Sequence, residues 1–428
     1  MLYRDLARLE EQGRHITLGV TGAGWMGSGF IRAVSRVPGM RVGVLADPDT
    51  GRARQALLDT GVEPARVVET GSPSQAADAL RAGKPVVTAD PALAAGLEQV
   101  DLVTDVTPSP ASGAATALAG IRGGKNVVLV NIEADVAVGR ALSREARRAG
   151  VLYSVSSGDE PGCLMELWDF VNALGYEPVV IGKGKNNPLQ PLANPDTVAG
   201  AASRAGKDPF QVASYVDGTK TMFEMCCAAN ATGCLPMKRG MIGPEADLST
   251  VSRVFALAVD GGVATAPYSV DFVQGSAMAG GVFATVRVQD RRIRDDLSYL
   301  KVGEGPYFTF FRPYHLWFLE APLSLARAHL YGQATLVPLD EPVAEVLAVA
   351  KKSMRAGERV DDFGGYCFRG VIDRAGEARR INALPAALAP GARLKNPVWR
   401  DKIIAWDDVE LDERSDLVRL RREQDAAV

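Results

Sequence analysis

The chain has 428 residues, of which 47% are hydrophobic, and a formal net charge of −3 at pH 7. This length exceeds what one compact core holds and predicts two or three domains. The composition is that of an ordinary globular protein. The small net charge gives no reason to expect nucleic acid or an anionic membrane surface as a partner.

The sequence predicts a cytoplasmic protein. No apolar run approaches the roughly 20 residues that cross a bilayer, and the charged N-terminus lacks the core of a signal peptide. The cysteines show no paired spacing, which favours a reducing compartment; they are Cys163, Cys226, Cys227, Cys234 and Cys367.

Residues 16–27 predict a dinucleotide-binding turn. A short apolar strand over Ile16–Val20 leads into a G-x-G-x-x-G run, and the following residues predict a helix. The first glycine allows the tight turn, the second lets a pyrophosphate approach the backbone, and the third lets helix and strand pack closely. Phosphates then lie at the helix N-terminus. The expected cofactor contacts are Gly22, Gly24, Trp25, Met26 and Gly27.

A second strand, Met40–Ala46, ends in Asp47, twenty residues after Gly27. An acid at this place binds the ribose hydroxyls and favours NAD. Arg52 and Arg54 could instead accommodate a 2′-phosphate, so the choice between NAD and NADP stays open. The alternative is an ordinary βαβ unit without a ligand.

Residues 14–155 alternate strand and helix patterns, which predicts a parallel sheet with helices on both faces. Ligands of such sheets lie beyond the carboxyl ends of the strands. Three strand ends carry polar side chains there, although each could also merely cap a helix. The expected site residues are Asp105, Thr107, Pro108, Asn131, Glu133, Ser156, Ser157, Asp159 and Glu160.

The middle region contains a candidate anion site. A predicted strand over Val179–Gly182 is followed by a loop, Gly182–Pro188, with two lysines and two asparagines. Such donors can hold a phosphate or carboxylate, and a solvated turn is the alternative. The candidate residues are Lys183, Lys185, Asn186 and Asn187.

A helix predicted over Phe210–Asn230 places Asp217, Lys220 and Glu224 on one face. Beside an apolar stripe, such a row can tune a lysine for proton transfer. A solvent-exposed salt bridge is an equally good interpretation of the spacing.

The remaining chain predicts more sheet and a second small module. Gly261–Asp290 and Tyr307–Phe311 predict strands, and a helix opens at Tyr314. An exposed sheet there is usually covered by another subunit, which predicts a homodimer or homotetramer. The last third predicts short strands, no catalytic grouping of its own, and an exposed charged tail over 409–428.

The order of these motifs resembles the homoserine dehydrogenase superfamily, and the last third resembles a SAF domain, a small β-clip module, through Ala348–Glu358. The combination is similar to homoserine dehydrogenase-like proteins that include an alternative deoxyxylulose phosphate reductoisomerase. The motifs are Asn131–Asp135, Ser157–Pro161, Gly182–Pro188 and Val216–Lys220.

The resemblance implies an α/β protein of three parts. A doubly wound Rossmann sheet occupies 1–160 and is completed by 312–331. An α+β catalytic and oligomerisation domain occupies 161–311. A β-rich SAF-like module and the tail occupy 332–428.

The resemblance also implies roles for individual residues. Lys220 is the general acid or base, Asp217 its orienting partner and Glu224 a supporting charge. The acid and lysine are three apart here, not four, and Asn131–Glu133 lacks the superfamily's lysine, so homoserine is a poor substrate candidate. If the reaction is an isomerisation as well, a divalent cation bridges vicinal oxygens; its candidate ligands are Glu133, Asp159 and Glu160.

We therefore expect an NAD- or NADP-dependent oxidoreductase that acts on a CH–OH group of a small, anionic hydroxy or keto substrate. One specific hypothesis is the conversion of 1-deoxy-D-xylulose 5-phosphate to 2-C-methyl-D-erythritol 4-phosphate. The alternatives are a dehydrogenase or oxidoisomerase of a branched sugar acid or other polyol, and a non-catalytic nucleotide-sensing protein.

Overall fold

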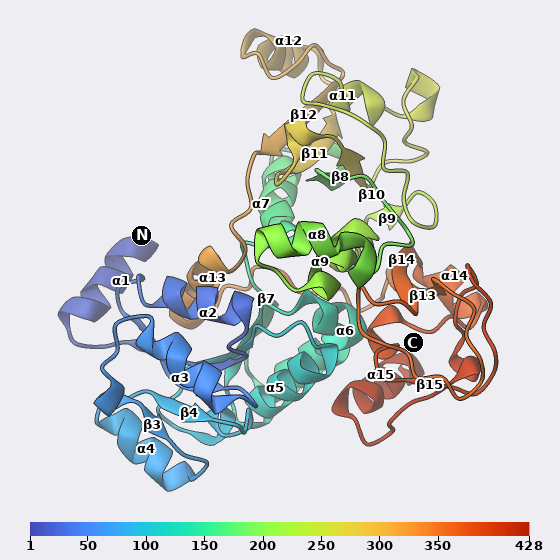
Figure 1. Cartoon of the computed structure of the whole chain (residues 1–428). Coiled ribbons are helices and arrows are strands. Elements are labelled where there is room, and N and C mark those ends of the chain that lie inside the picture. The colour runs from blue at the N-terminus through green and yellow to red at the C-terminus, as the bar shows by residue number, and fades with distance from the viewer. Residues whose placement is uncertain (428) are drawn as a thin grey trace. The chain divides into compact units, whose positions relative to one another are not determined.

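The computed structural model describes residues 1–427 and forms two compact units (Figure 1). The first unit comprises Met1–Gly162, Leu316–Val337 and the residues from Arg414 onward. The second comprises Cys163–His315 and Pro338–Glu413. The segment Pro338–Glu413 thus shares a unit with the middle region, whereas the resemblance implies a separate module.

The first unit contains a seven-stranded sheet in the order β3-β4-β2-β1-β5-β6-β7, and its strand pairs are parallel. The order reverses direction at β1, which has β2 on one side and β5 on the other. This confirms the predicted α/β architecture with a parallel Rossmann-like sheet. The strands are β1 (Ile16–Thr21), β2 (Met40–Ala46), β3 (Val68–Glu69), β4 (Val86–Thr88), β5 (Leu102–Asp105), β6 (Asn126–Leu129) and β7 (Tyr153–Val155).

The helices of the first unit pack around an apolar core. Strand β1 is buried along its whole length, as an apolar strand inside a parallel sheet should be, and Phe30 and Leu325 pack against the same core. The helices are α1 (Leu2–Glu11), α2 (Trp25–Val34), α3 (Thr50–Leu58), α4 (Pro73–Arg81), α5 (Pro110–Arg122), α6 (Ile132–Ala149), α13 (Ala321–Tyr331) and α15 (Asp416–Ala426).

The predicted exposed tail is wrong. Helix α15 lies against α6 (Figure 1) and buries Leu417, Val418 and Leu420. The side chain of Gln424 accepts a hydrogen bond from the Ala141 N–H at 3.0 Å and donates one to the Ala137 carbonyl at 3.1 Å. The segment is highly charged overall, but it has a narrow apolar stripe that is sufficient to pack the helix against α6.

The second unit is built on a mixed five-stranded sheet in the order β12-β11-β8-β10-β9. Strand β8 is parallel to β10 and antiparallel to β11. The strands are β8 (Glu177–Lys185), β9 (Leu235–Pro236), β10 (Ser269–Gln274), β11 (Val282–Arg287) and β12 (Tyr307–Arg312). The sheet predicted for the middle region is therefore confirmed, and the structure shows that it is mixed.

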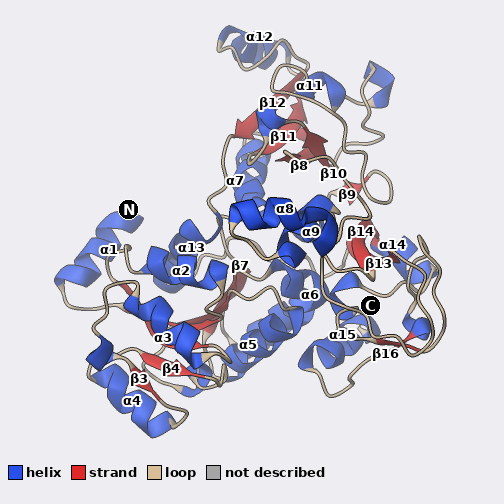
Figure 2. Cartoon of the chain, viewed as in Figure 1, coloured by secondary structure: helices blue, strands red, loops and turns tan. Residues whose placement is uncertain are grey.

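Loops dominate the C-terminal part of this unit (Figure 2). Its hairpin pairs β13 (Ala344–Ala350) with β14 (Phe368–Arg374), and β15 (Arg393–Leu394) pairs with β16 (Val409–Glu410). The helices of the unit are α7 (Glu160–Ala173, which begins in the first unit), α8 (Pro195–Ala205), α9 (Pro209–Val216), α10 (Thr219–Thr232), α11 (Val251–Val254), α12 (Arg291–Tyr299) and α14 (Ala375–Arg380).

Helix α10 packs on the β13–β14 hairpin through two polar side chains. Asn230 Oδ1 accepts hydrogen bonds from the N–H groups of Val343 and Ala344. Thr219 Oγ1 accepts one from the Gly370 N–H at 2.9 Å. A Cβ at Gly370 would lie 3.2 Å from the Thr219 methyl group, so glycine permits this close approach. The hairpin is therefore an integral part of the second unit.

Three predicted element boundaries are wrong. The helix predicted over Phe210–Asn230 is broken at Gly218, whose φ of 91° no helix interior adopts. Strand β8 runs on to Lys185 where a loop is expected from Gly182. The helix expected from Tyr314 begins only at Ala321, after a 3₁₀ turn.

None of the helices within residues 1–427 combines the length and apolarity needed to cross a membrane.

Candidate functional site

The glycine turn (residues 22–27) has the geometry that a dinucleotide site requires. Gly22 has φ 105°, and a Cβ there would lie 2.7 Å from the Thr107 methyl group. A Cβ at Gly27 would lie 2.3 Å from the Gly22 carbonyl oxygen. A Cβ at Gly24 would meet no atom within 4 Å among the described residues. The fold thus requires Gly22 and Gly27, whereas Gly24 leaves open surface where a phosphate can approach.

The N-terminus of α2 adjoins this open surface. Gly24 is its N-cap, and within residues 1–427 no side chain caps it and no acid lies in its first turn. The N–H groups of a helix's first turn and its dipole together favour an anion. Trp25 is 48% exposed and contacts Trp317 and Phe318 edge-on, while Met26 is half-buried. The residues present therefore fit the pyrophosphate of a dinucleotide.

Asp47 is held against the glycine turn. One carboxylate oxygen accepts the Ala23 N–H at 2.7 Å. The other accepts the Asp49 N–H at 2.9 Å and pairs with the Arg52 guanidinium at 2.7 Å. Arg54 instead donates to the carbonyls of Pro64 and Val67, which removes it as a candidate for a 2′-phosphate. Asp47 and Arg52 remain the candidate residues for discrimination between NAD and NADP.

A buried carboxylate organises the next strand end. Asp105 accepts hydrogen bonds from the N–H and hydroxyl of Thr107, at 2.9 and 2.7 Å, and from the Asn131 amide at 3.0 Å. Burial raises the pKa of Asp105, which these donors oppose. Asn131 also caps α6 by accepting the Ala134 N–H, which fixes the start of α6 at Ile132. Pro108 is exposed beside Thr107.

The residues that follow β7, the last strand of the parallel sheet, are buried. Ser156 and Ser157 are buried, and the Ser157 N–H donates to Ser324 Oγ at 3.2 Å. Asp159 and Glu160, both buried, stand at the start of α7. Glu133 lies in the first turn of α6, where the helix dipole stabilises a carboxylate. A divalent cation at these acids stays a prediction.

In the second unit, Lys183 and Lys185 lie on one side of β8. A Cβ at Gly182 would lie 2.0 Å from the Asp271 carbonyl oxygen, and one at Gly184 would lie 1.8 Å from the Met278 carbonyl oxygen. The glycines therefore serve close packing on the opposite side of a strand, not a loop. This alternation with period two overturns the loop interpretation of the Gly-Lys-Gly-Lys run.

Both lysines are buried and engaged. Lys183 Nζ forms an ion pair with Glu224 of α10. Lys185 Nζ donates to the Tyr215 carbonyl at 2.7 Å and to Asn187 Oδ1 at 2.8 Å. Burial, and then repulsion from Lys183, lower the pKa of Lys185 to about 8. Asn186, by contrast, is exposed.

Asp217 does not pair with Lys220 as predicted. Because α9 ends at Val216 and α10 begins at Thr219, the two residues do not share one helical face. Asp217 Oδ2 pairs with Lys351 Nζ at 2.6 Å, and Oδ1 accepts the Thr219 N–H at 2.8 Å. Glu224 pairs with Lys183 instead, and Lys220 is half-buried in the first turn of α10.

These side chains form a buried charge cluster, defined as Lys183, Lys185, Asp217, Glu224 and Lys351. The cluster has three cations and two anions, and Asp217 and Glu224 both raise the pKa of Lys185, which shows that the charges act on one another. Buried positive charge in excess favours an anionic ligand. The amine of Lys185, with a pKa of about 8, is suited to proton transfer.

Sequence reasoning missed Lys351. It follows β13, a strand of seven buried residues, and is itself 6% exposed, whereas its neighbour Lys352 is exposed. The only local signal is a lysine directly at the end of a continuous apolar strand. Its acidic partner lies far away along the chain, so nothing nearby identifies it.

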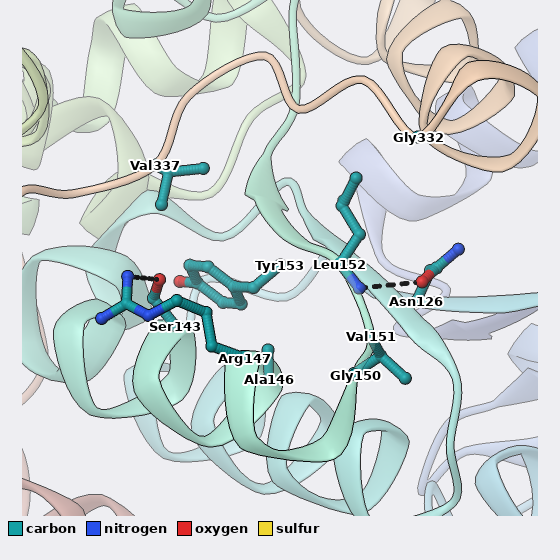
Figure 3. A pocket seen from close by; sticks show the side chains of 10 residues that line it. All are labelled: Asn126, Ser143, Ala146, Arg147, Gly150, Val151, Leu152, Tyr153, Gly332 and Val337. Atoms are coloured by element: carbon teal, nitrogen blue, oxygen red, sulfur yellow. Dashed lines mark hydrogen bonds between the residues drawn. The ribbon is translucent and has the colours of Figure 1, made fainter.

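The first unit also contains a hollow of about 450 Å³, at the amino ends of its strands (Figure 3). It is bounded by the last turns of α6, which carry Ser143 and Arg147, and by Asn126 and Leu152 at the amino ends of β6 and β7. Ligands of parallel sheets bind at the opposite, carboxyl ends. This hollow is therefore not the dinucleotide site.

Part of the chain is similar to a known oxidoreductase domain. Residues 158–321 match the family model described as the catalytic domain of oxidoreductase DRL. These 164 of 428 residues contain β8, α9 and α10, but neither the glycine turn nor Lys351. No curated protein matches the sequence.

Many solved structures resemble the chain distantly. A probable dehydrogenase from Thermotoga maritima has 13% identity and a TM-score of 0.43 over 74% of this chain and 90% of its own. Scyllo-inositol dehydrogenase from Lactobacillus casei, with bound NAD(H) and scyllo-inositol, has 13% and 0.43 over 76% and 92%. KijD10, a 3-ketoreductase from Actinomadura kijaniata in complex with NADP, has 16% and 0.38 over 75% and 91%. Likeness at this level supports no statement about this chain's substrate or cofactor.

Proposed function

We propose that the protein is an NAD(P)-dependent oxidoreductase that interconverts a hydroxyl and a carbonyl group on a small substrate with a phosphate or carboxylate. The observation that carries this proposal is the buried charge cluster. Its excess of positive charge and its lysine of lowered pKa lie in the unit that contains most of the residues matched to an oxidoreductase catalytic domain. The open surface at Gly24 supports the dinucleotide.

The residues divide into two tasks. When bound, the nicotinamide accepts or supplies the hydride. Lys183, kept in place by Glu224, attracts the anionic group of the substrate. Lys185 takes the hydroxyl proton during oxidation, as the hydride leaves the same carbon, and returns a proton to the carbonyl oxygen during reduction. Lys220 is the second candidate for this proton transfer, and Asn187 orients Lys185.

The substrate class follows from the charge of the site. A ligand without an anionic group leaves the net positive charge of the buried cluster uncompensated, whereas a phosphate or carboxylate forms charge-assisted hydrogen bonds worth roughly 1.5–3 kcal/mol each. Deoxyxylulose phosphate and branched sugar acids both meet this requirement. A homo-oligomer in which the mixed sheet is covered is part of the same proposal.

A screen with purified protein tests the proposal. NADH and NADPH are offered with deoxyxylulose phosphate, a set of branched keto sugar acids and homoserine's aldehyde precursor, each beside a neutral analogue without the anionic group. Loss of the absorbance of reduced nicotinamide is followed. We expect turnover of at least one anionic compound, with kcat/KM about 100-fold above that of its neutral analogue.

The opposite result points to the competing hypothesis. If the protein binds NAD(H) or NADP(H) but consumes neither with any member of the panel, in either direction, the oxidoreductase proposal fails and a nucleotide-sensing protein is favoured.

A further inference from the structure

Lys351 is held by three separate segments of the second unit. Its ammonium group donates to the Ala193 carbonyl at 2.6 Å and to the Gly365 carbonyl at 2.8 Å, and it pairs with Asp217 Oδ2 at 2.6 Å. An ammonium has three protons to donate, and three acceptors surround this one. A buried lysine with this arrangement has a fixed position.

The carboxylate that Lys351 contacts is equally constrained. Asp217 is 1% exposed, stands at the C-terminal end of α9 and accepts the Thr219 N–H across the turn at Gly218. Burial raises the pKa of Asp217, and Lys351 is the strongest influence that lowers it. Without the ammonium, a carboxyl group in this environment favours its neutral, protonated form.

The charge of Asp217 acts on Lys185. Lys185 Nζ donates to the carbonyl of Tyr215, two residues before Asp217. The negative charges of Glu224 and Asp217 raise the pKa of Lys185, in opposition to burial and to Lys183. The charge of Asp217 also acts on Arg369 of β14, and Lys220 follows Asp217 by three residues, in the first turn of α10.

We propose that Lys351 is a positioning residue that keeps Asp217 ionised and fixed beside Lys185, so that the C-terminal segment completes the reacting centre. This inference rests on the proposed function for its biological meaning, but its electrostatic content can be measured without a substrate. It gives the C-terminal part of the second unit a role at the reacting centre, where the sequence predicts no catalytic grouping.

Loss of the Lys351 charge should change the pKa of Lys185 in one direction. If Lys351 loses its charge, Asp217 becomes protonated and no longer favours the ammonium form of Lys185, so the pKa of Lys185 falls. If Asp217 instead remained ionised without Lys351, its charge would be uncompensated and the pKa of Lys185 would stay constant or rise. The two directions separate the inference from its alternative.

Competitive acetylation of the full chain measures this pKa. Samples are labelled across a pH series, and the extent of labelling of Lys185 is read by peptide mass spectrometry. In the wild type we expect a midpoint of about 8. In Lys351→Gln, whose amide can still donate to the surrounding carbonyls, we expect the midpoint to fall by about half a pH unit or more. Asp217→Asn should give the same direction.

Two controls make the result specific. Lys351→Arg retains the positive charge and should keep the wild-type midpoint. Lys352→Gln removes an adjacent exposed charge that pairs with Glu358 at 3.4 Å, and should leave the midpoint unchanged. An unchanged or raised midpoint in Lys351→Gln overturns the inference. If that variant does not fold by circular dichroism, an unchanged or raised midpoint in Asp217→Asn overturns it instead.

The proposed function fails separately. A wild-type protein that shows the expected labelling shifts but reduces no carbonyl compound would refute the oxidoreductase and leave the electrostatic role of Lys351 in place.

Discussion

The glycine turn of the first unit and the buried charge cluster of the second are built in opposite ways. The turn uses six consecutive residues and presents mainly backbone groups beside open surface. The cluster gathers side chains from β8, the α9–α10 junction, α10 and the residue after β13, and all five are buried. A backbone site depends on the absence of side chains, whereas the cluster depends on every partner being present.

This difference predicts how each region fails. A site made of backbone groups is lost when a side chain fills the open surface, and the fold survives. A site made of buried charges is lost when one partner is removed, and the fold is weakened as well, because the remaining charge has no compensation.

The largest effect is expected at Gly24. Gly24→Val places a side chain in space that is open in the structure, so the fold should persist while a pyrophosphate can no longer approach. Titration calorimetry with NADH and NADPH should show no measurable binding. Gly71→Val, also at an open position of the first unit, is the matched control and should bind normally.

The next effect concerns stability. Lys183→Met leaves Glu224, which is 2% exposed, without its ion-pair partner. Such a loss costs about 3–5 kcal/mol of unfolding free energy, and urea denaturation measures it. The double variant Lys183→Met/Glu224→Leu should recover most of this loss, and Arg292→Met, in an exposed pair, should change stability by less than about 0.5 kcal/mol. Equal losses in the single and double variants would contradict a buried pair.

The pH dependence of turnover is the third test. Oxidation requires Lys185 as the neutral amine, so the rate should rise about tenfold per pH unit below pH 8 and level off above it. Reduction requires the ammonium form and should decline above the same pH. Initial rates in both directions across a pH series check this, and a profile that is flat between pH 6 and 9 in roughly constant ionic strength would argue against Lys185.

The smallest effect is expected at Arg52. Its guanidinium is exposed and pairs with Asp47, so it can turn toward a 2′-phosphate. Arg52→Ala should weaken NADPH about tenfold relative to NADH, which corresponds to about 1.4 kcal/mol. The ratio of the two dissociation constants is the measurement. Arg54→Ala removes a guanidinium already bound to carbonyl oxygens and should not change the ratio.

The same contrast explains what the sequence could predict. The parallel sheet, the glycine turn and Asp47 follow from local spacing, and the structure has the turn and the acid adjacent. The cluster could not be predicted without knowing that Gly182 and Gly184 allow close strand packing and that Gly218 breaks a helix. It also depends on the ion pair between Lys351 and Asp217. All three depend on contacts between residues that are distant in the sequence. The predicted Asp217–Lys220 pair is wrong because the turn at Gly218 ends one helix and starts another.

The position of the C-terminal helix α15 also could not be predicted from local sequence. Its charged residues indicate an exposed tail, but Leu417, Val418 and Leu420 dock it and Gln424 binds the backbone of α6. Three apolar side chains decide its position, and a count of charges could not reveal them.

The most direct test of the central claim is the turnover of Lys185→Met with the substrate that the screen identifies. If Lys185 transfers the proton, kcat should fall about 100-fold or more while cofactor affinity stays unchanged, and Lys352→Gln should retain the wild-type rate. A Lys185→Met enzyme that turns over at the wild-type rate would contradict the assignment of the buried charge cluster as the reacting centre.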